Sequence, residues 1–187
     1  ENYLTQKYGE VGKKIHTLRS RNDQVLAALR LYEKEELKEI EGLLILFSKV
    51  LDSLIEKHGA VEMPGYTHMQ KAMPTKIKTW LSSFINSMDD NLLLLDTTLK
   101  LIDQNPLGSA AGFGVPVFEI DKDSTTKELN FSKVQENPMY CQLSRGKFES
   151  TILHLLTQIM FDLNKLASDL ILFNMPEFGY LTLPKEF

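Results

Sequence analysis

The stretch "LSSFINSMDDNLLLLDTTLKLI", Leu81 to Ile102, repeats apolar residues in alternating steps of four and three. The repeating residues are Leu81, Ile85, Met88, Leu92, Leu95, Leu99 and Ile102. Such steps keep the side chains on one narrow stripe of an α-helix, which is typical of long helices packed lengthwise in a bundle. The spacing therefore predicts one helix from about Thr75 to Gln104.

Two further segments have the same helical periodicity. The segment from about Asp23 to His58 has a charged face opposite an apolar one made of Ile40, Leu43, Leu44, Phe47, Leu51, Leu54 and Ile55. The segment from about Lys147 to Met175 has its apolar face at Ile152, Leu155, Ile159, Leu163, Leu166, Leu170 and Phe173. Gly59 and Pro176 follow these segments as natural helix stops, so three long helices are expected.

The connecting segments show no sustained strand pattern, so the predicted class is all-α, a bundle of long helices. Residues 105–116 form a turn-rich loop of small residues, and Asp121 to Leu129 begins with capping-type residues that favour a short helix. Three helices of this length have more apolar surface than they can bury against one another. We expect the surplus to be buried against other copies or against parts beyond this chain.

The composition is that of an ordinary globular protein, with 43% hydrophobic and 25% charged residues among 187. The net charge is −4 and no basic stripe dominates, which argues against a nucleic-acid partner. No apolar run approaches the ~20 residues that a membrane span requires. A single cysteine, Cys141, excludes an internal disulfide and favours the cytoplasm. Because the chain begins with Glu1 and stops at Phe187, we expect both ends to be cut.

The stretch from Gly12 to Val25 places Ser20, Arg21 and Asn22 just before the first long helix. An Asn22–Asp23 pair is a candidate N-cap, and a helix start offers free N–H donors with positive dipole. Arginines at 19 and 21 could bind a carboxylate bidentately. The alternative is an ordinary capped helix whose arginines face solvent.

The stretch "MPGYTHMQKAMP", Met63 to Pro74, holds Thr67, His68 and Gln70 between a Pro-Gly pair and a second proline. It precedes the second long helix, so we expect a rigid polar turn at a helix start. Thr67 could bind an anionic group while His68 transfers a proton, since a histidine titrates near working pH. The alternative is a structural turn whose histidine is simply hydrogen-bonded.

The loop from Gly108 to Gly114 lacks the preceding strand that a phosphate cradle needs. We expect its small residues to allow close packing between helix ends instead.

Three stretches in this order, "HTLRSRNDQV", "MPGYTHMQKAMP" and "NPLGSAAG", resemble the argininosuccinate lyase family. This family is a branch of the superfamily that includes fumarase, aspartase and adenylosuccinate lyase. The resemblance extends over essentially the whole chain, including "DLILF" and "EFGYLTLP" near its end. Within the superfamily, the Ser-Arg-Asn-Asp run and a tyrosine before Thr-His indicate the argininosuccinate branch.

The resemblance implies part of an all-α homotetramer whose active sites are each assembled from three subunits. The implied reaction splits argininosuccinate into arginine and fumarate by acid/base elimination, a step of arginine biosynthesis that uses no metal or organic cofactor. Ser20, Arg21 and Asn22 would grip the succinyl carboxylates, Thr67 and Gln70 would bind substrate, and Thr67 and His68 would form the catalytic pair. The family's carbon-acid base is usually placed on a mobile serine loop, with the histidine as its partner.

The chain departs from the family pattern in two places. "SRGK" at Ser144 to Lys147 replaces the usual Asp-Arg-Asp, and the serine loop expected after "LTLP" is absent. Residues 1–187 are therefore expected to be an incomplete central helical domain that is inactive alone. Two alternatives remain, namely a non-catalytic scaffold like the lens crystallins of this superfamily, and a sister lyase acting on another succinyl-amine.

Overall fold

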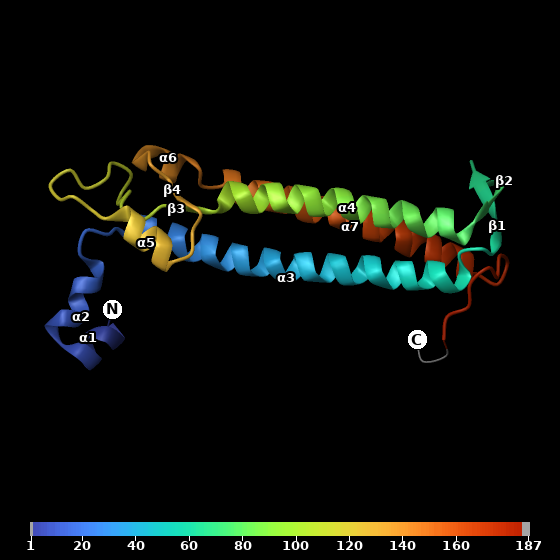
Figure 1. Cartoon of the computed structure of the whole chain (residues 1–187), viewed down its shortest axis with the longest axis horizontal. Coiled ribbons are helices and arrows are strands. Elements are labelled where there is room, and N and C mark those ends of the chain that lie inside the picture. The colour runs from blue at the N-terminus through green and yellow to red at the C-terminus, as the bar shows by residue number, and fades with distance from the viewer. Residues whose placement is uncertain (1, 185–187) are drawn as a thin grey trace. The chain divides into compact units, whose positions relative to one another are not determined.

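The computed structural model describes residues 2–184, and most of them are helical, which confirms the predicted class. Three long helices dominate, as Figure 1 shows, namely α3 (Arg21–His58), α4 (Ile77–Ile102) and α7 (Lys147–Asn174). The shorter elements are α1 (Asn2–Tyr8), α2 (Glu10–Lys13), η1 (Lys14–His16), β1 (Glu62–Thr67), β2 (Gln70–Lys76), β3 (Gln104–Asn105), α5 (Lys122–Glu128), β4 (Lys133–Val134) and α6 (Pro138–Leu143). All three predicted long helices and the predicted short helix at α5 are confirmed.

The stripe of apolar residues on α4 is buried as its spacing predicts. Every seventh residue, at Leu81, Met88, Leu95 and Ile102, is at most 4% exposed. The residues between them in the series, Ile85, Leu92 and Leu99, are half-buried. A strict heptad of buried residues is the pattern that lengthwise helix packing produces.

The chain divides into two compact units. The first contains residues 2–38 and 97–151, and the second contains residues 39–96 and 152–184. Each of the three long helices contributes a segment to both units, and each unit has its own core.

Arg30 lies in the interior of the first unit and is only 2% exposed. Its guanidinium donates to the carbonyl oxygen of Gln104 at 2.7 Å and to Ser144 Oγ at 3.1 Å, and it stacks over the ring of Phe148 at 4.9 Å. A buried charge is costly unless it is hydrogen-bonded, and these contacts meet that need. Arg30 therefore ties α3 to β3, to the end of α6 and to the start of α7.

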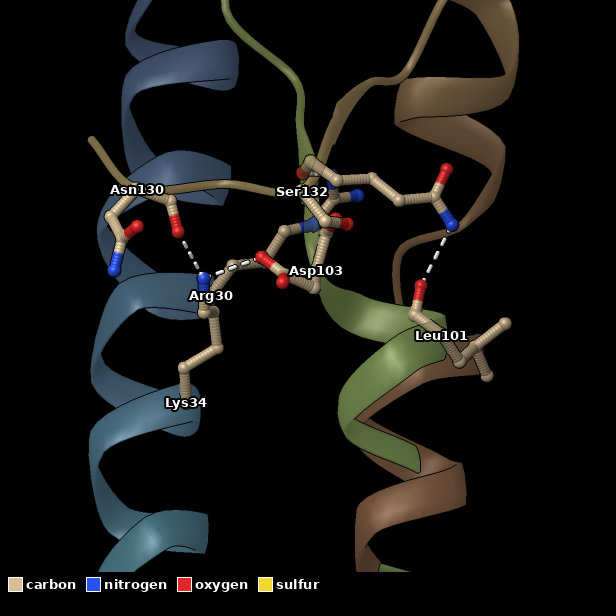
Figure 2. Close-up of polar contacts among 7 residues, drawn as sticks. Arg30, Lys34, Leu101, Asp103, Asn130 and Ser132 are labelled. Carbon is tan, nitrogen blue, oxygen red and sulfur yellow. Dashed lines mark hydrogen bonds and ion pairs between the residues drawn. The ribbon is translucent and has the colours of Figure 1, made fainter. Parts of the chain in front are cut away.

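One turn further along α3, Lys34 makes a second link, which Figure 2 shows beside Arg30. Its ammonium group contacts the Asp103 carboxylate and donates to the carbonyl oxygen of Asn130 at 2.6 Å. Ser132 Oγ donates to the carbonyl oxygen of Asp103 at 2.6 Å. These bonds fix the end of α4 and the segment between α5 and β4 against α3.

The core of the second unit is apolar. Leu51 of α3, Leu81 and Phe84 of α4, and Leu166 of α7 form one buried cluster. Trp80 packs against this cluster, and its indole N–H donates to Asp169 Oδ2 at 2.8 Å. Asn91 Nδ2 donates to Asp162 Oδ2 at 2.9 Å, so α4 and α7 are also joined by polar bonds.

The expectation that no strand separates the helices is wrong for residues 62–76. β1 and β2 form an antiparallel hairpin, with Glu62 opposite Lys76 and Thr67 opposite Gln70. Nearly all of β2 is exposed, so the hairpin has no apolar face to produce the period-two pattern that predicts strands. β3 and β4 form a second, two-residue parallel pair.

Within residues 2–184, none of the helices combines the length and apolar character that spanning a membrane would require.

Candidate functional site

The start of α3 is capped by Ser20 rather than by the predicted Asn22–Asp23 pair. The Asn22 N–H donates to Ser20 Oγ at 3.2 Å, and the Ser20 N–H donates to Asp23 Oδ1 at 2.9 Å. This reciprocal arrangement is a capping box with aspartate in the third helical position. The helix therefore begins two residues earlier than expected, and Arg21 and Asn22 lie in its first turn.

Asp23 is fully buried and also holds the loop that follows β3. Its Oδ2 accepts bonds from the N–H groups of Gly108 at 3.3 Å and Ala110 at 3.0 Å. Gly108 has φ +92°, and a Cβ there would lie 3.1 Å from the Lys122 side chain. The prediction that small residues in this loop allow close packing at a helix end is confirmed.

Three arginines surround the first turn of α3. Arg19 and Arg21 are exposed, which fits both the carboxylate-receptor prediction and the alternative of solvent-facing arginines on a capped helix. Arg145, between α6 and α7, donates from Nη2 to the carbonyl oxygen of Asn22 at 2.8 Å. Guanidinium groups and the positive end of a helix dipole both favour a bound carboxylate. We call Ser20, Arg21 and Asn22 the anion-receptive surface of the first unit, and their binding of an anion stays a prediction.

Sequence reasoning missed Arg145 as a neighbour of this surface. The Ser144–Lys147 run stood out only as a departure from the family pattern, and no local signal links it to residue 22. Ser144 is buried and accepts bonds from Arg30 and from Gln135 Nε2, the latter at 3.2 Å. Only the tertiary packing of α6 against α3 reveals the link.

Thr67, His68 and Gln70 lie at the tip of the β1–β2 hairpin, and not at a helix start as predicted. Thr67 and Gln70 are paired, and the two residues between them have positive φ, 52° at His68 and 61° at Met69. That geometry is a tight hairpin turn normally made with glycine or asparagine. Non-glycine residues in this region store strain, often at functional sites. The expected polar turn is confirmed, at a hairpin tip instead of a helix start, and its rigidity stays a prediction.

The tip side chains face solvent. Thr67, His68 and Gln70 are exposed, and their side chains have no hydrogen-bond partner among the residues that the structure describes. The alternative of a structural histidine held by a hydrogen bond is therefore not supported in the described part of the chain.

Close backbone contact keeps the hairpin narrow below its tip. A Cβ on Gly65 would lie 2.6 Å from the carbonyl oxygen of Met73, so only glycine fits there. The strand pairing shifts between Pro64 and Tyr66, which marks a bulge. Bulges re-aim side chains, and here the next inward residue is Tyr66, which is half-buried.

The predicted site residues form two groups. Ser20, Arg21 and Asn22 lie together in the first unit, whereas Thr67, His68 and Gln70 lie together in the second. The expectation that both groups face one shared pocket stays a prediction. Within the described residues, no three His, Cys, Asp or Glu side chains are placed to hold a metal ion.

Comparison with known proteins finds relatives that match nearly the whole chain. A family model described as "Lyase" matches residues 2–186. An argininosuccinate lyase of Thermotoga neapolitana is 55% identical over all of this chain and 46% of its own length. One of Xylella fastidiosa is 44% identical over all of this chain and 42% of its own. One of Xanthomonas campestris is 41% identical over 98% and 42%. The chain thus spans less than half the length of these relatives.

Solved structures share the fold at low identity. EDDS lyase in complex with formate superposes with a TM-score of 0.90 at 23% identity, covering 95% of this chain and 35% of that one. A fumarate lyase from Mesorhizobium sp. BNC1 gives 0.83 at 22% identity, covering 95% and 42%. A "fumarate lyase:delta crystallin" from Brucella melitensis bound to cobalt gives 0.80 at 18%, covering 92% and 38%. At such identities the likeness shows the fold alone.

Proposed function

We propose, since this chain belongs to the lyase family, that it is the central part of an argininosuccinate lyase that splits argininosuccinate into arginine and fumarate. The observation that carries this proposal is the exposed His68 on a strained hairpin tip, with Thr67 beside it, in a chain that matches named argininosuccinate lyases throughout. The anion-receptive first turn of α3 supports it, because the substrate's succinyl part has two carboxylates.

The proposed reaction is an elimination. A base removes a proton from the carbon next to a carboxylate, the electrons left behind form the carbon–carbon double bond of fumarate, and the bond to the guanidinium nitrogen breaks. The leaving nitrogen keeps the electron pair of the broken bond and takes up a proton, so arginine departs with a cationic guanidinium group. Charge accumulates on the carboxylate beside the reacting carbon, and preorganised donors stabilise it there.

We assign the roles by chemistry. Ser20, Arg21 and Asn22 bind the succinyl carboxylates, with the Arg145 guanidinium holding the backbone of Asn22. Thr67 and Gln70 bind a further substrate oxygen. His68 transfers or relays the proton, a task for which imidazole is suited near neutral pH.

The complete protein is proposed to be a cytoplasmic homotetramer. Large apolar side chains remain exposed on all three long helices, among them Leu43 and Leu46 on α3, Leu93 on α4, and Leu153 and Ile171 on α7. Burial of such residues against other copies is the usual reason for their presence. The buried free thiol of Cys141 supports a reducing compartment.

The full-length protein carrying His68→Asn tests the assignment. We expect kcat for argininosuccinate, followed by fumarate absorbance, to fall about 10²- to 10⁴-fold because a positioned acid or base is lost. The control is His58→Asn, at the far end of α3 from the anion-receptive turn, which should turn over normally. Unchanged turnover in His68→Asn would contradict the role of His68.

The same assay separates the remaining alternatives. Activity on adenylosuccinate, aspartate or malate, with none on argininosuccinate, would identify a sister lyase. A folded oligomer that eliminates none of these substrates would identify a structural scaffold.

A further inference from the structure

A hydrogen bond between two tyrosine hydroxyls connects the catalytic hairpin to the segment after α7. The hydroxyl oxygens of Tyr66 and Tyr180 lie 2.6 Å apart. Tyr66 is on β1 immediately before Thr67, and Tyr180 lies beyond the end of α7. The hairpin is thus joined, through one side-chain bond, to a part of the chain 114 residues later.

Tyr180 is itself firmly anchored. The N–H groups of Tyr180 and Leu181 both donate to the carbonyl oxygen of Phe173, at 2.9 and 3.1 Å. The Tyr180 ring lies 5.9 Å from the Phe173 ring and stacks on Phe178 at 5.7 Å. Phe173 in turn packs edge-on against Trp80 of α4 at 5.4 Å. The Tyr180 hydroxyl is therefore held in place by both α7 and α4.

Tyr66 is the packed side chain closest to the hairpin tip. Among the described residues of the hairpin, Met63 to Tyr66 are half-buried, whereas Thr67 to Pro74 are exposed. The Tyr66 ring meets Phe178 edge-on at 5.6 Å, and its hydroxyl reaches Tyr180. A two-stranded hairpin alone is marginally stable in water, so its outer half depends on such contacts.

The pair is also suited to remain intact across the working pH range. The hydrogen bond with Tyr180, followed by burial, raises the pKa of Tyr66 above its ordinary value near 10. The Tyr66 hydroxyl therefore keeps its proton above neutral pH and can donate it to the Tyr180 oxygen.

Resting on the function proposed above, we infer that Tyr180 is a positioning residue, whose hydroxyl fixes Tyr66 and so holds Thr67 and His68 at the orientation that proton transfer needs. Tyr180 does not touch the substrate. Removal of the Tyr180 hydroxyl should leave substrate affinity intact and slow the chemical step. The reason is that a more mobile hairpin tip would hold His68 out of alignment with the substrate for part of the time.

The test uses the full-length protein with Tyr66→Phe, Tyr180→Phe and the double variant, each of which keeps the aromatic rings. We expect kcat to fall about three- to tenfold in each single variant with KM little changed, as loss of one hydrogen bond predicts. The double variant should lose no more than either single variant, since the two hydroxyls act as one unit. Tyr32→Phe, an exposed tyrosine on α3, is the control and should behave as wild type.

Hydrogen–deuterium exchange supplies a readout independent of activity. Amides of residues 67–70 should exchange faster in Tyr180→Phe, while those in the middle of α4 should not change. The inference would be overturned if Tyr180→Phe kept both the wild-type kcat and the wild-type amide exchange rates of residues 67–70. Additive losses of kcat in the double variant would overturn it as well. Either outcome would leave the proposed function standing. A wild-type protein without elimination activity would overturn the proposed function, and the exchange experiment would still decide whether Tyr180 holds the tip.

Discussion

Arg30 brings a positive charge into the interior of the first unit, and the carboxyl groups of Glu33 and Glu149 are close enough to affect it. Burial lowers the pKa of Arg30. Burial, and then repulsion from Glu149, raise the pKa of Glu33 to about 7, against the attraction of Arg30. The Oε2 atoms of both glutamates are buried without a hydrogen-bond partner in the described part of the chain. Desolvation therefore outweighs the nearby cation at Glu33.

The raised pKa of Glu33 implies that the free energy of unfolding depends on pH. Because the pKa of Glu33 is about 7 when folded and near 4.5 when unfolded, the folded state binds an extra proton between these values. Stability should therefore fall as pH rises from about 4.5 to 7, and the contribution is lost above 7. Glu33→Gln should be about 1 kcal/mol more stable than wild type at pH 8, after allowing for solvent screening of a half-buried carboxyl.

Thermal unfolding of both proteins at several pH values between 5 and 8 measures this difference. The exposed Glu36→Gln on the same helix is the control and should track wild type. Equal pH slopes in wild type and Glu33→Gln would show that Glu33 is not the group responsible.

At the scale of elements, Asp23 joins the start of α3 to the loop after β3. One carboxylate accepts N–H bonds from Ser20, Gly108 and Ala110. The anion-receptive surface thus depends on a residue that is itself fully buried. The buried Asp23 carboxylate therefore orients the first helical turn of α3, which carries Arg21 and Asn22.

Replacing Asp23 tests that dependence. Asp23→Ala would leave three N–H groups without their acceptor, so we expect a loss of about 2–4 kcal/mol in the free energy of unfolding. Asp23→Asn keeps one acceptor oxygen and should lose less. In the full-length protein we also expect a higher KM for argininosuccinate with either change. Denaturant unfolding and steady-state kinetics measure the two effects, and an Asp23→Ala protein of wild-type stability would contradict the argument.

The sequence predicts the long helices well because their apolar residues face a bundle and so repeat with a helical period. It fails at the hairpin, where nearly all of β2 is exposed and the strand therefore has no apolar alternation. It also misplaces the cap of α3, because Asn22 and Asp23 are good capping residues by type, and only the bonds made by Ser20 show which residue caps. The residue types of the candidate site could be identified from the sequence. The contacts of Arg145 and Tyr180 could not, because they depend on tertiary packing.

At the scale of the whole molecule, the two groups of site residues lie in different units, and the chain spans less than half of its relatives. The proposed homotetramer offers a way to unite them, since one copy can supply Ser20, Arg21 and Asn22 while another supplies Thr67 and His68. We propose that the exposed apolar residues on α3, α4 and α7 would be buried in such an assembly.

Mixing two inactive variants of the full-length protein tests this sharing. Arg21→Ala and His68→Asn should each be nearly inactive. When equal amounts of the two variants exchange subunits, the mixture should regain roughly one quarter of wild-type activity. The reason is that one site in four would take Arg21 from a His68→Asn copy and His68 from an Arg21→Ala copy. His68→Asn mixed with Thr67→Ala is the matched control. These two changes lie on the same hairpin, so no mixed site escapes both, and activity should stay low. If Arg21→Ala and His68→Asn regain nothing although light scattering and tagged-subunit capture show that they mix, both groups of residues come from one copy, and the shared site must be abandoned.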